Sequence, residues 1–215
     1  MSELKSLGGI GERILAYLDG KNAARDLALQ RTRTMIRHCA TAIRAAHRDE
    51  RDLAQEHLQQ AREIKEALRD ELGPYPDLYY AGYTQDALKE YAEASIVYAL
   101  LSGEALPDPD DLEVEYAAYL GGLGEAAGEL RRRTLDILRH DRSAEAEQLL
   151  EMMDEIYGLL VTVDFPDAIT GKLRRLTDVV RGIVERTRGD LTTSLQQDEL
   201  KSALQSMERR LDRES

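Results

Sequence analysis

The sequence has few of the residues that build sheets or cross-linked folds. Its 215 residues include no Trp, 1 Phe, 5 Pro and 1 Cys, and no stretch alternates β-branched with polar residues as a strand would. Ala, Leu, Glu, Arg and Gln, which favour helices, are abundant instead. We therefore expect an all-α bundle of about six or seven helices, some of them long. The length predicts a single domain over residues 1–215, with residues 1–20 as an N-terminal extension and 196–215 as a tail.

The one cysteine excludes an intramolecular disulfide, and no cluster of Cys and His has zinc spacing. We interpret Cys39 as a small buried apolar residue. The first twenty residues lack the pattern of a signal peptide, and no apolar run approaches about 18 residues. These features predict a soluble, cytoplasmic protein.

Lysine is scarce, because only 6 of the 29 basic residues are Lys and the rest are Arg. The net charge of −12 and the sequence pI of about 4.9 argue against polyanion binding over the whole surface. An acid-rich, Lys-poor composition favours a halophilic source. The alternative is an ordinary acidic protein from a GC-rich genome, since Arg and Ala codons are rich in G and C.

A basic stripe stands out against this acidic background. Residues 23–48 are predicted to be helical, and between residues 25 and 48 the sequence has six Arg and one acid, Asp26. Four of these arginines follow spacings of 4, 7 and 4 and so share one side of a helix: Arg33, Arg37, Arg44 and Arg48. The stripe favours a nucleic-acid contact. The alternative is a partner for acidic helices, within the fold or across an oligomer interface.

Two acids interrupt the apolar face of the helix predicted over residues 86–101. At about 100° per residue, Glu90 and Glu93 share a face with Ala94, Val97 and Leu101. A buried carboxylate without a partner is costly. This pair is therefore expected to have basic partners or to hold a metal ion.

A second pair of acids lies in the helix predicted over residues 112–139. Glu125 and Glu129 are one turn apart, on the side of Ala118 and two glycines, where a facing helix could approach closely. That facing helix could be the one with Glu90 and Glu93. Carboxylates suit Mg²⁺ or Mn²⁺, and such a site favours phosphodiester hydrolysis. The alternative is ion pairing, with residues 131–133 or with the basic stripe.

The remaining patterns complete the helical outline. They predict a short helix over residues 3–19 that stops at Asp19 and Gly20, and further helices over 49–72, over 143–163 and from about 168 past 188. The polar tail after residue 190 is predicted to be frayed or part of an interface. The tyrosines between residues 75 and 83 could stack on bases or pack a helix junction.

Four segments of this sequence resemble the translin family, and within it the TRAX-type and archaeal translin-like proteins. They are LKEYAEA (88–94), EYAAYLGGLGEAAGELRRR (115–133), MMDEIYGLL (152–160) and KLRRLTDVVRGIVERTRGDL (172–191). The resemblance covers roughly residues 23–192. It implies an all-helical fold that assembles into a hollow octamer and binds single-stranded RNA or DNA inside. It also implies that TRAX-type chains are Mg²⁺-dependent endoribonucleases.

The resemblance assigns roles to the four glutamates. Glu90 and Glu93 correspond to a metal-binding Glu-x-x-Glu pair, Glu125 to an acid on the later helix, and Glu129 to the glutamate of a Gly-Glu-Leu motif. Position 125 is usually Asp in TRAX-type chains, so this side chain is one methylene longer. We expect these four residues to be the metal-binding and catalytic set, with Mg²⁺ or Mn²⁺, and the basic stripe to contact phosphates. The alternatives are a non-catalytic translin-like binder of single-stranded RNA or DNA, and a purely structural helical assembly protein.

Overall fold

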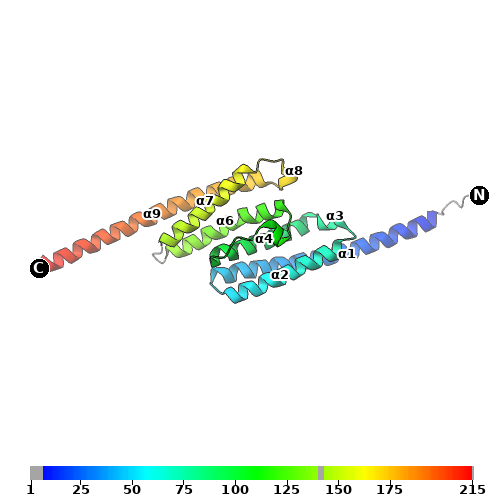
Figure 1. Ribbon diagram of the computed structural model, residues 1–215, viewed down its shortest axis with the longest axis horizontal. Helices are drawn as coiled ribbons and strands as arrows, with labels where there is room; N and C mark the ends of the chain where they lie inside the picture. Colours follow the sequence, from blue (N-terminus) through cyan, green and yellow to red (C-terminus); the bar gives the residue numbers. More distant parts are fainter. Residues whose placement is uncertain (1–6, 140–142, 215) are drawn as a thin grey trace, which may run out of the picture. The chain divides into compact units, whose positions relative to one another are not determined.

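The computed structural model describes residues 7–139 and 143–214, and within them every regular element is a helix (Figure 1). The all-α prediction is confirmed, although there are nine described helices instead of six or seven. In chain order they are α1 (Leu7–His47), α2 (Arg51–Leu72), α3 (Pro76–Tyr79), α4 (Gly82–Ser102), α5 (Pro109–Leu112), α6 (Tyr116–Leu138), α7 (Ser143–Thr162), α8 (Asp167–Thr170) and α9 (Leu173–Glu214).

The additional helices are short turns beside prolines. Helices α3, α5 and α8 have four residues each, and Pro76, Pro109 and Pro166 lie at or directly before their first residues. Proline fits the first turn of a helix because it needs no N–H partner there. The structure therefore places a single helical turn at each of these three prolines.

Helix α1 is continuous, so the predicted stop at Asp19 and Gly20 is wrong. Residues 3–6 of the helix predicted there lie outside the described residues. At Gly20 an added Cβ would lie 3.0 Å from the Tyr75 hydroxyl. Lys21 forms an ion pair with Asp77 at 2.7 Å, and the rings of Tyr17 and Tyr75 are 5.8 Å apart. The glycine therefore makes room for the segment before α3 and does not end the helix.

The chain divides into two compact units, Met1–Ala118 and Tyr119–Ser215. In the first unit α1 and α2 form an antiparallel hairpin, and α4 packs on it (Figure 1). Small residues line the packed faces, including Ala42, Ala45, Ala54 and Ala61, each buried. Cys39 is fully buried in this core, as predicted. That residues 1–215 form a single translin-like domain stays a prediction.

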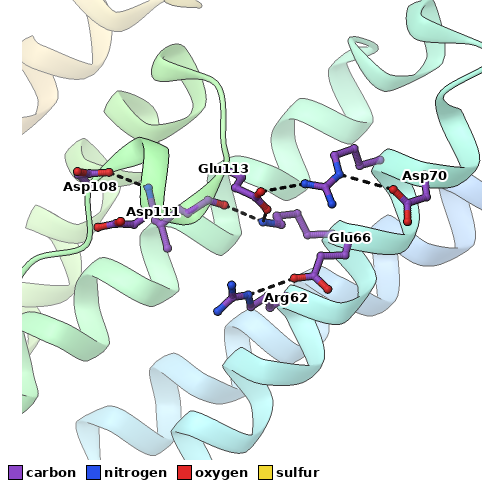
Figure 2. A network of polar contacts seen from close by, with 9 residues as sticks. Arg62, Glu66, Asp70, Asp108, Asp111 and Glu113 are labelled. Atoms are coloured by element: carbon purple, nitrogen blue, oxygen red, sulfur yellow. Dashed lines mark hydrogen bonds and ion pairs between the residues drawn. The ribbon is translucent and has the colours of Figure 1, made fainter.

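A buried lysine fixes the turn that follows α5. The Lys65 side chain is 2% exposed, and its ammonium donates to the Leu112 carbonyl at 2.9 Å and to the Glu113 carboxylate at 2.7 Å. Arg69 also pairs with Glu113 at 3.0 Å (Figure 2). Glu113 has a φ of +50°, a left-handed conformation that ends α5. These contacts hold the turn through which the chain enters α6.

The second unit contains most of α6, with α7 and α9 side by side. Buried apolar residues come from all three helices: Leu123 and Leu130 of α6, Met153 and Leu160 of α7, and Val180 and Val184 of α9. The helix predicted from about residue 168 begins at Leu173, because Gly171 and Lys172 have positive φ angles and separate α8 from α9. None of the described helices is long and apolar enough to cross a lipid bilayer.

Candidate functional site

The first pair of predicted site residues lies on the most buried helix of the first unit. Every residue of α4 from Tyr91 to Ala99 is buried, because the helix has apolar or small residues on nearly all sides. Glu93 lies within this run and is 8% exposed, and Glu90 is half-buried one turn earlier. Glu93 is the one acid among the buried residues of α4, so its position is unusual for a carboxylate.

The two carboxylates both lie close to Cys39 of α1. The pKa of the Cys39 thiol is raised, first by burial and then by the negative charges of Glu90 and Glu93. Carboxylate oxygens of Glu90 and Glu93 lie within 4.8 Å of each other. A thiol with a raised pKa stays protonated at neutral pH and is a poor metal ligand. The donors available at this point are carboxylate oxygens, which suit a hard cation such as Mg²⁺.

Glu90 also has a basic neighbour. Its carboxylate lies 3.2 Å from the ammonium of Lys89, and the two side chains are 28% and 24% exposed. A partly exposed pair of this kind lowers the cost of one carboxylate by a modest amount. This contact is of the ion-pair type that the sequence left open as an alternative to metal binding.

The second pair of predicted site residues lies on α6. Glu125 and Glu129 are both half-buried and one turn apart, between buried residues such as Ala126, Ala127 and Leu130. Side chains four residues apart on a helix are neighbours, so these carboxylates share a side of α6. Glu129 also lies 3.5 Å from Arg132.

The three consecutive arginines of α6 have different partners. Arg131 donates to the Thr187 hydroxyl at 2.9 Å and to Asp190 at 2.8 Å, which joins α6 to α9. Arg133 lies 3.8 Å from Glu145 of α7. The predicted alternative of ion pairing with residues 131–133 is therefore seen at Glu129, through Arg132.

All four arginines of the basic stripe are exposed: Arg33, Arg37 and Arg44 lie on α1, and Arg48 lies in the turn directly after it. Arg37 donates to Thr34 and Arg44 donates to Thr41, each at 2.9 Å and one turn back along the helix. Arg48 forms an ion pair with Glu50 at 2.8 Å, whereas the other three have no acidic partner among the described residues. The guanidinium groups of Arg33, Arg37 and Arg44 are therefore available to phosphates.

The other two arginines of this region serve the fold. Arg31 forms a bidentate ion pair with Glu71, and this pair joins α1 to α2. Arg25 lies 3.1 Å from its neighbour Asp26. The alternative in which basic residues pair with acidic helices within the fold is thus seen at Arg31, whereas Arg25 and Arg48 pair with acids one and two residues away in the sequence.

One polar contact had no signal in the sequence. His38 of α1 and His57 of α2 meet with their Nδ1 atoms 3.0 Å apart, and His57 Nδ1 is also 3.1 Å from Oε1 of the Gln60 side chain. The two histidines are 19 residues apart, and no helical spacing relates them. Only the antiparallel packing of α1 on α2 brings them together.

The comparisons with known proteins agree with the fold. No protein-family model matches the chain. A protein of Methanocaldococcus jannaschii with no assigned function is 30% identical over 199 residues, which cover 91% of this chain and 87% of the relative.

Three solved structures share the fold. C3PO from Archaeoglobus fulgidus in complex with duplex RNA has a TM-score of 0.79 and 35% identity, covering 85% of this chain and 95% of that one. A crystal structure of the same C3PO has a TM-score of 0.79 and 34% identity, again covering 85% of this chain and 95% of that one. Apo C3PO from Neurospora has a TM-score of 0.77 and 22% identity, covering 90% of this chain and 100% of that one, and it supports the fold. These are translin/TRAX-type proteins.

The chain belongs to this translin-like family. The resemblance of the four sequence segments is thereby confirmed. The roles of the four glutamates and of the basic stripe are a separate matter, because membership of a family does not fix what a given side chain does.

Proposed function

We propose that the protein is a Mg²⁺-dependent endoribonuclease that binds and cleaves RNA with single-stranded character inside a hollow homo-oligomer, an octamer. The observation that carries the proposal is the pair of carboxylates on α4, where Glu93 is buried, Glu90 is half-buried and their oxygens lie within 4.8 Å of each other. Such a pair is costly unless a cation neutralises it. The A. fulgidus C3PO, which is 35% identical, forms a complex with duplex RNA, and this supports RNA as the ligand class.

In this proposal the metal is held by carboxylates from two helices. Glu90 and Glu93 of α4 and Glu125 of α6 are the ligands, and Glu129 is a fourth ligand or orients the attacking water. Mn²⁺ could replace Mg²⁺, since both prefer oxygen donors. The ion, when bound, supplies a water of lowered pKa and positive charge for the phosphodiester oxygens.

The basic stripe has a separate role. Arg33 and Arg44 are 11 residues apart on α1, about 16 Å at 1.5 Å per residue, and Arg48 follows in the next turn, so the stripe is long enough to reach several phosphates. Guanidinium groups bind phosphate oxygens through two parallel hydrogen bonds. The stripe would hold the RNA backbone without reading its bases.

A second candidate function is a non-catalytic translin-like protein that binds single-stranded RNA or DNA. The ion pairs of Glu90 with Lys89 and of Glu129 with Arg132 favour it, because they neutralise two of the four carboxylates without metal. The longer side chain at position 125, where TRAX-type chains usually have Asp, also favours this candidate. This candidate predicts binding that leaves the RNA intact in Mg²⁺ or Mn²⁺.

The deciding experiment replaces both α4 carboxylates by amides of the same shape. Glu90→Gln with Glu93→Gln should abolish Mg²⁺-dependent cleavage of a short single-stranded RNA and leave gel-shift binding intact. Asp86→Asn is the matched control, because Asp86 is an acid one turn earlier on the same helix. Undiminished cleavage by the double variant would refute the enzymatic proposal. Intact RNA with the unmodified protein would favour the binder, and no shift even at low salt would favour a purely structural protein.

Metal binding has a readout that does not depend on cleavage. A ligand that binds only the folded chain stabilises it by about 1.4 kcal/mol at ten times its Kd. Mg²⁺ should therefore raise the Tm of the unmodified protein and of Asp86→Asn, but not of the double variant. Equal shifts in all three proteins would place the ion elsewhere.

A further inference from the structure

The C-terminal half of α9 has an apolar stripe that nothing in the described part of the chain covers. Four residues at spacings of 4, 3 and 4 form what we call the tail stripe: Leu200, Leu204, Met207 and Leu211, which are 61, 54, 61 and 56% exposed. Every described side chain from Glu199 to Asp212 is exposed. Figure 1 shows this orange and red part of α9 continuing beyond the N-terminal end of α7.

The tail stripe has the pattern of a helix that pairs with another helix. Spacings of 4 and 3 repeat every seven residues, which is the seam of a coiled coil. The other sides of this segment are polar, with Ser202, Gln205, Ser206 and Arg209. The helix itself is already formed, because α9 is continuous with a half that packs on α7 through Leu191 and the ion pair of Arg188 with Asp154. Exposed leucines in this register are a docking surface.

The spacing of the tail stripe is the same when it is read from either end. In an antiparallel pair of tails, Leu200 would lie opposite Leu211 of a second copy, and Leu204 opposite Met207 of that copy. Each of these two contacts then occurs twice, related by a two-fold axis, as a closed dimer interface requires. We propose that the tail stripe docks on the tail stripe of a second copy of this chain, in antiparallel orientation.

The charges beside the stripe favour this orientation. Lys201 and Glu208 flank the seam on the same side, seven residues apart. In the antiparallel pair Lys201 of each copy lies beside Glu208 of the other, which gives two attractive contacts. In a parallel pair the corresponding neighbours are Lys201 with Gln196 and Glu208 with Ala203, which give none. Charges at these positions set partner choice and direction in coiled coils.

Cysteine cross-linking tests the pairing and its direction in the full-length chain. Leu200→Cys and Leu211→Cys are prepared as two separate proteins, and the one native cysteine, Cys39, is buried. Under mild oxidant a mixture of the two should form a disulfide-linked dimer, whereas each protein alone should not. Residues 200 and 211 are about 16 Å apart along a helix, and a disulfide needs Cα atoms within about 7 Å. Dimers from either protein alone, or none from the mixture, would overturn the proposal.

A charge placed in the seam gives an independent measurement. Leu204→Glu should reduce the mass of the particle, measured by light scattering across a dilution series, because the carboxylates would be buried without partners. Ser202→Glu is the matched control, since it adds the same charge to an exposed polar side of the same helix turn. Circular dichroism checks that both variants keep their helix content. Equal masses for Leu204→Glu, Ser202→Glu and the unmodified chain would refute the docking of the tail stripe.

Discussion

At the scale of single residues, Lys65 is a fully buried charge in the first unit. Its stem packs among apolar residues of α2 and α4, and its ammonium lies 5.9 Å from the centre of the Tyr91 ring. The hydrogen bond from Lys65 is the largest cause that holds the pKa of the Glu113 carboxyl below its ordinary value. A long side chain can bury its methylenes while its charged end reaches a partner. Lys65 therefore contributes both packing and a polar contact.

The first prediction concerns this residue. Lys65→Ala should lower the free energy of unfolding by about 2–4 kcal/mol, because it leaves a cavity and removes the donor to the Leu112 carbonyl. Arg62→Ala, an exposed position three residues earlier on α2, should change it by about 0.5 kcal/mol or less. Urea denaturation measures both. Equal decreases would mean that Lys65 is dispensable to the turn after α5.

A second residue-scale prediction concerns pH. Burial, then the charge of His57 and then that of Arg37 lower the pKa of His38. The unfolded chain therefore takes up a proton at this histidine more readily than the folded chain. The stabilising effect of neutral His38 is complete above about pH 6.5 and is lost as the pH falls below it.

The measurement is urea denaturation at pH 7.5 and at pH 5.5. The unmodified chain should be less stable at the lower pH, because a charged His38 would be partly buried beside Arg37. His38→Gln should show a smaller difference between the two pH values. An unchanged difference would assign the pH dependence to other groups.

At the scale of elements, the glycines of α6 decide how closely α7 and α9 approach it. A Cβ at Gly124 would lie 2.5 Å from a methyl carbon of Leu176 and 3.4 Å from one of Leu160. At Gly128 the first neighbour, a methyl carbon of Ile183, would be 4.0 Å away. Two glycines one turn apart on the same helix therefore have different roles. Gly124 is required for packing, whereas Gly128 has room for a side chain.

The third prediction follows from this contrast. Gly124→Ala should lower the free energy of unfolding by about 1–3 kcal/mol, because the new methyl group would displace Leu176. Gly128→Ala should raise it by about 0.4–1 kcal/mol, since alanine favours the helix and restricts the unfolded chain. Thermal or urea unfolding of the two variants gives the signs directly. Two changes of the same sign would contradict the packing described for α6.

At the scale of the whole molecule, a net charge of −12 coexists with an exposed basic stripe on α1. The net charge keeps polyanions away at long range, and salt screens this repulsion beyond about 10 Å at 0.1 M. Contacts made directly by Arg33, Arg37 and Arg44 would act within that distance. The stripe, and not the charge of the whole protein, would then govern how RNA binding depends on salt.

The fourth prediction tests this point. Arg37→Ala should weaken binding of a short single-stranded RNA and reduce the slope of log K against log salt by about 0.7 for each phosphate that the variant no longer neutralises. Arg25→Ala removes an equal charge from the same helix, at a position where Asp26 already pairs with it. It should change the slope less. Fluorescence anisotropy would measure the affinity for RNA at salt concentrations from about 50 to 200 mM and so give the two slopes. Equal slopes for the two variants would exclude a specific role for the stripe.

The sequence by itself determined the helical class, the exposed register of the four stripe arginines and the translin-like family. The first two of these features depend on local geometry, because spacings of three, four and seven residues place side chains on one side of a helix. The family followed from the resemblance of four sequence segments. The same spacing rule placed Glu90 and Glu93 together on one face of a buried helix. Their joint role with Glu125 and Glu129 stays a prediction.

Only the tertiary structure decided what each local signal means. Gly20 looked like a helix stop, but Tyr75, 55 residues later, occupies the space that a side chain would need. The contacts of Lys65 with Glu113 and of His38 with His57 likewise join residues 48 and 19 positions apart. No periodicity relates such residues, because their contact depends on how whole helices pack and where the turns between them lie. Local pattern therefore fixes which side of a helix a residue occupies, whereas packing fixes what it meets there.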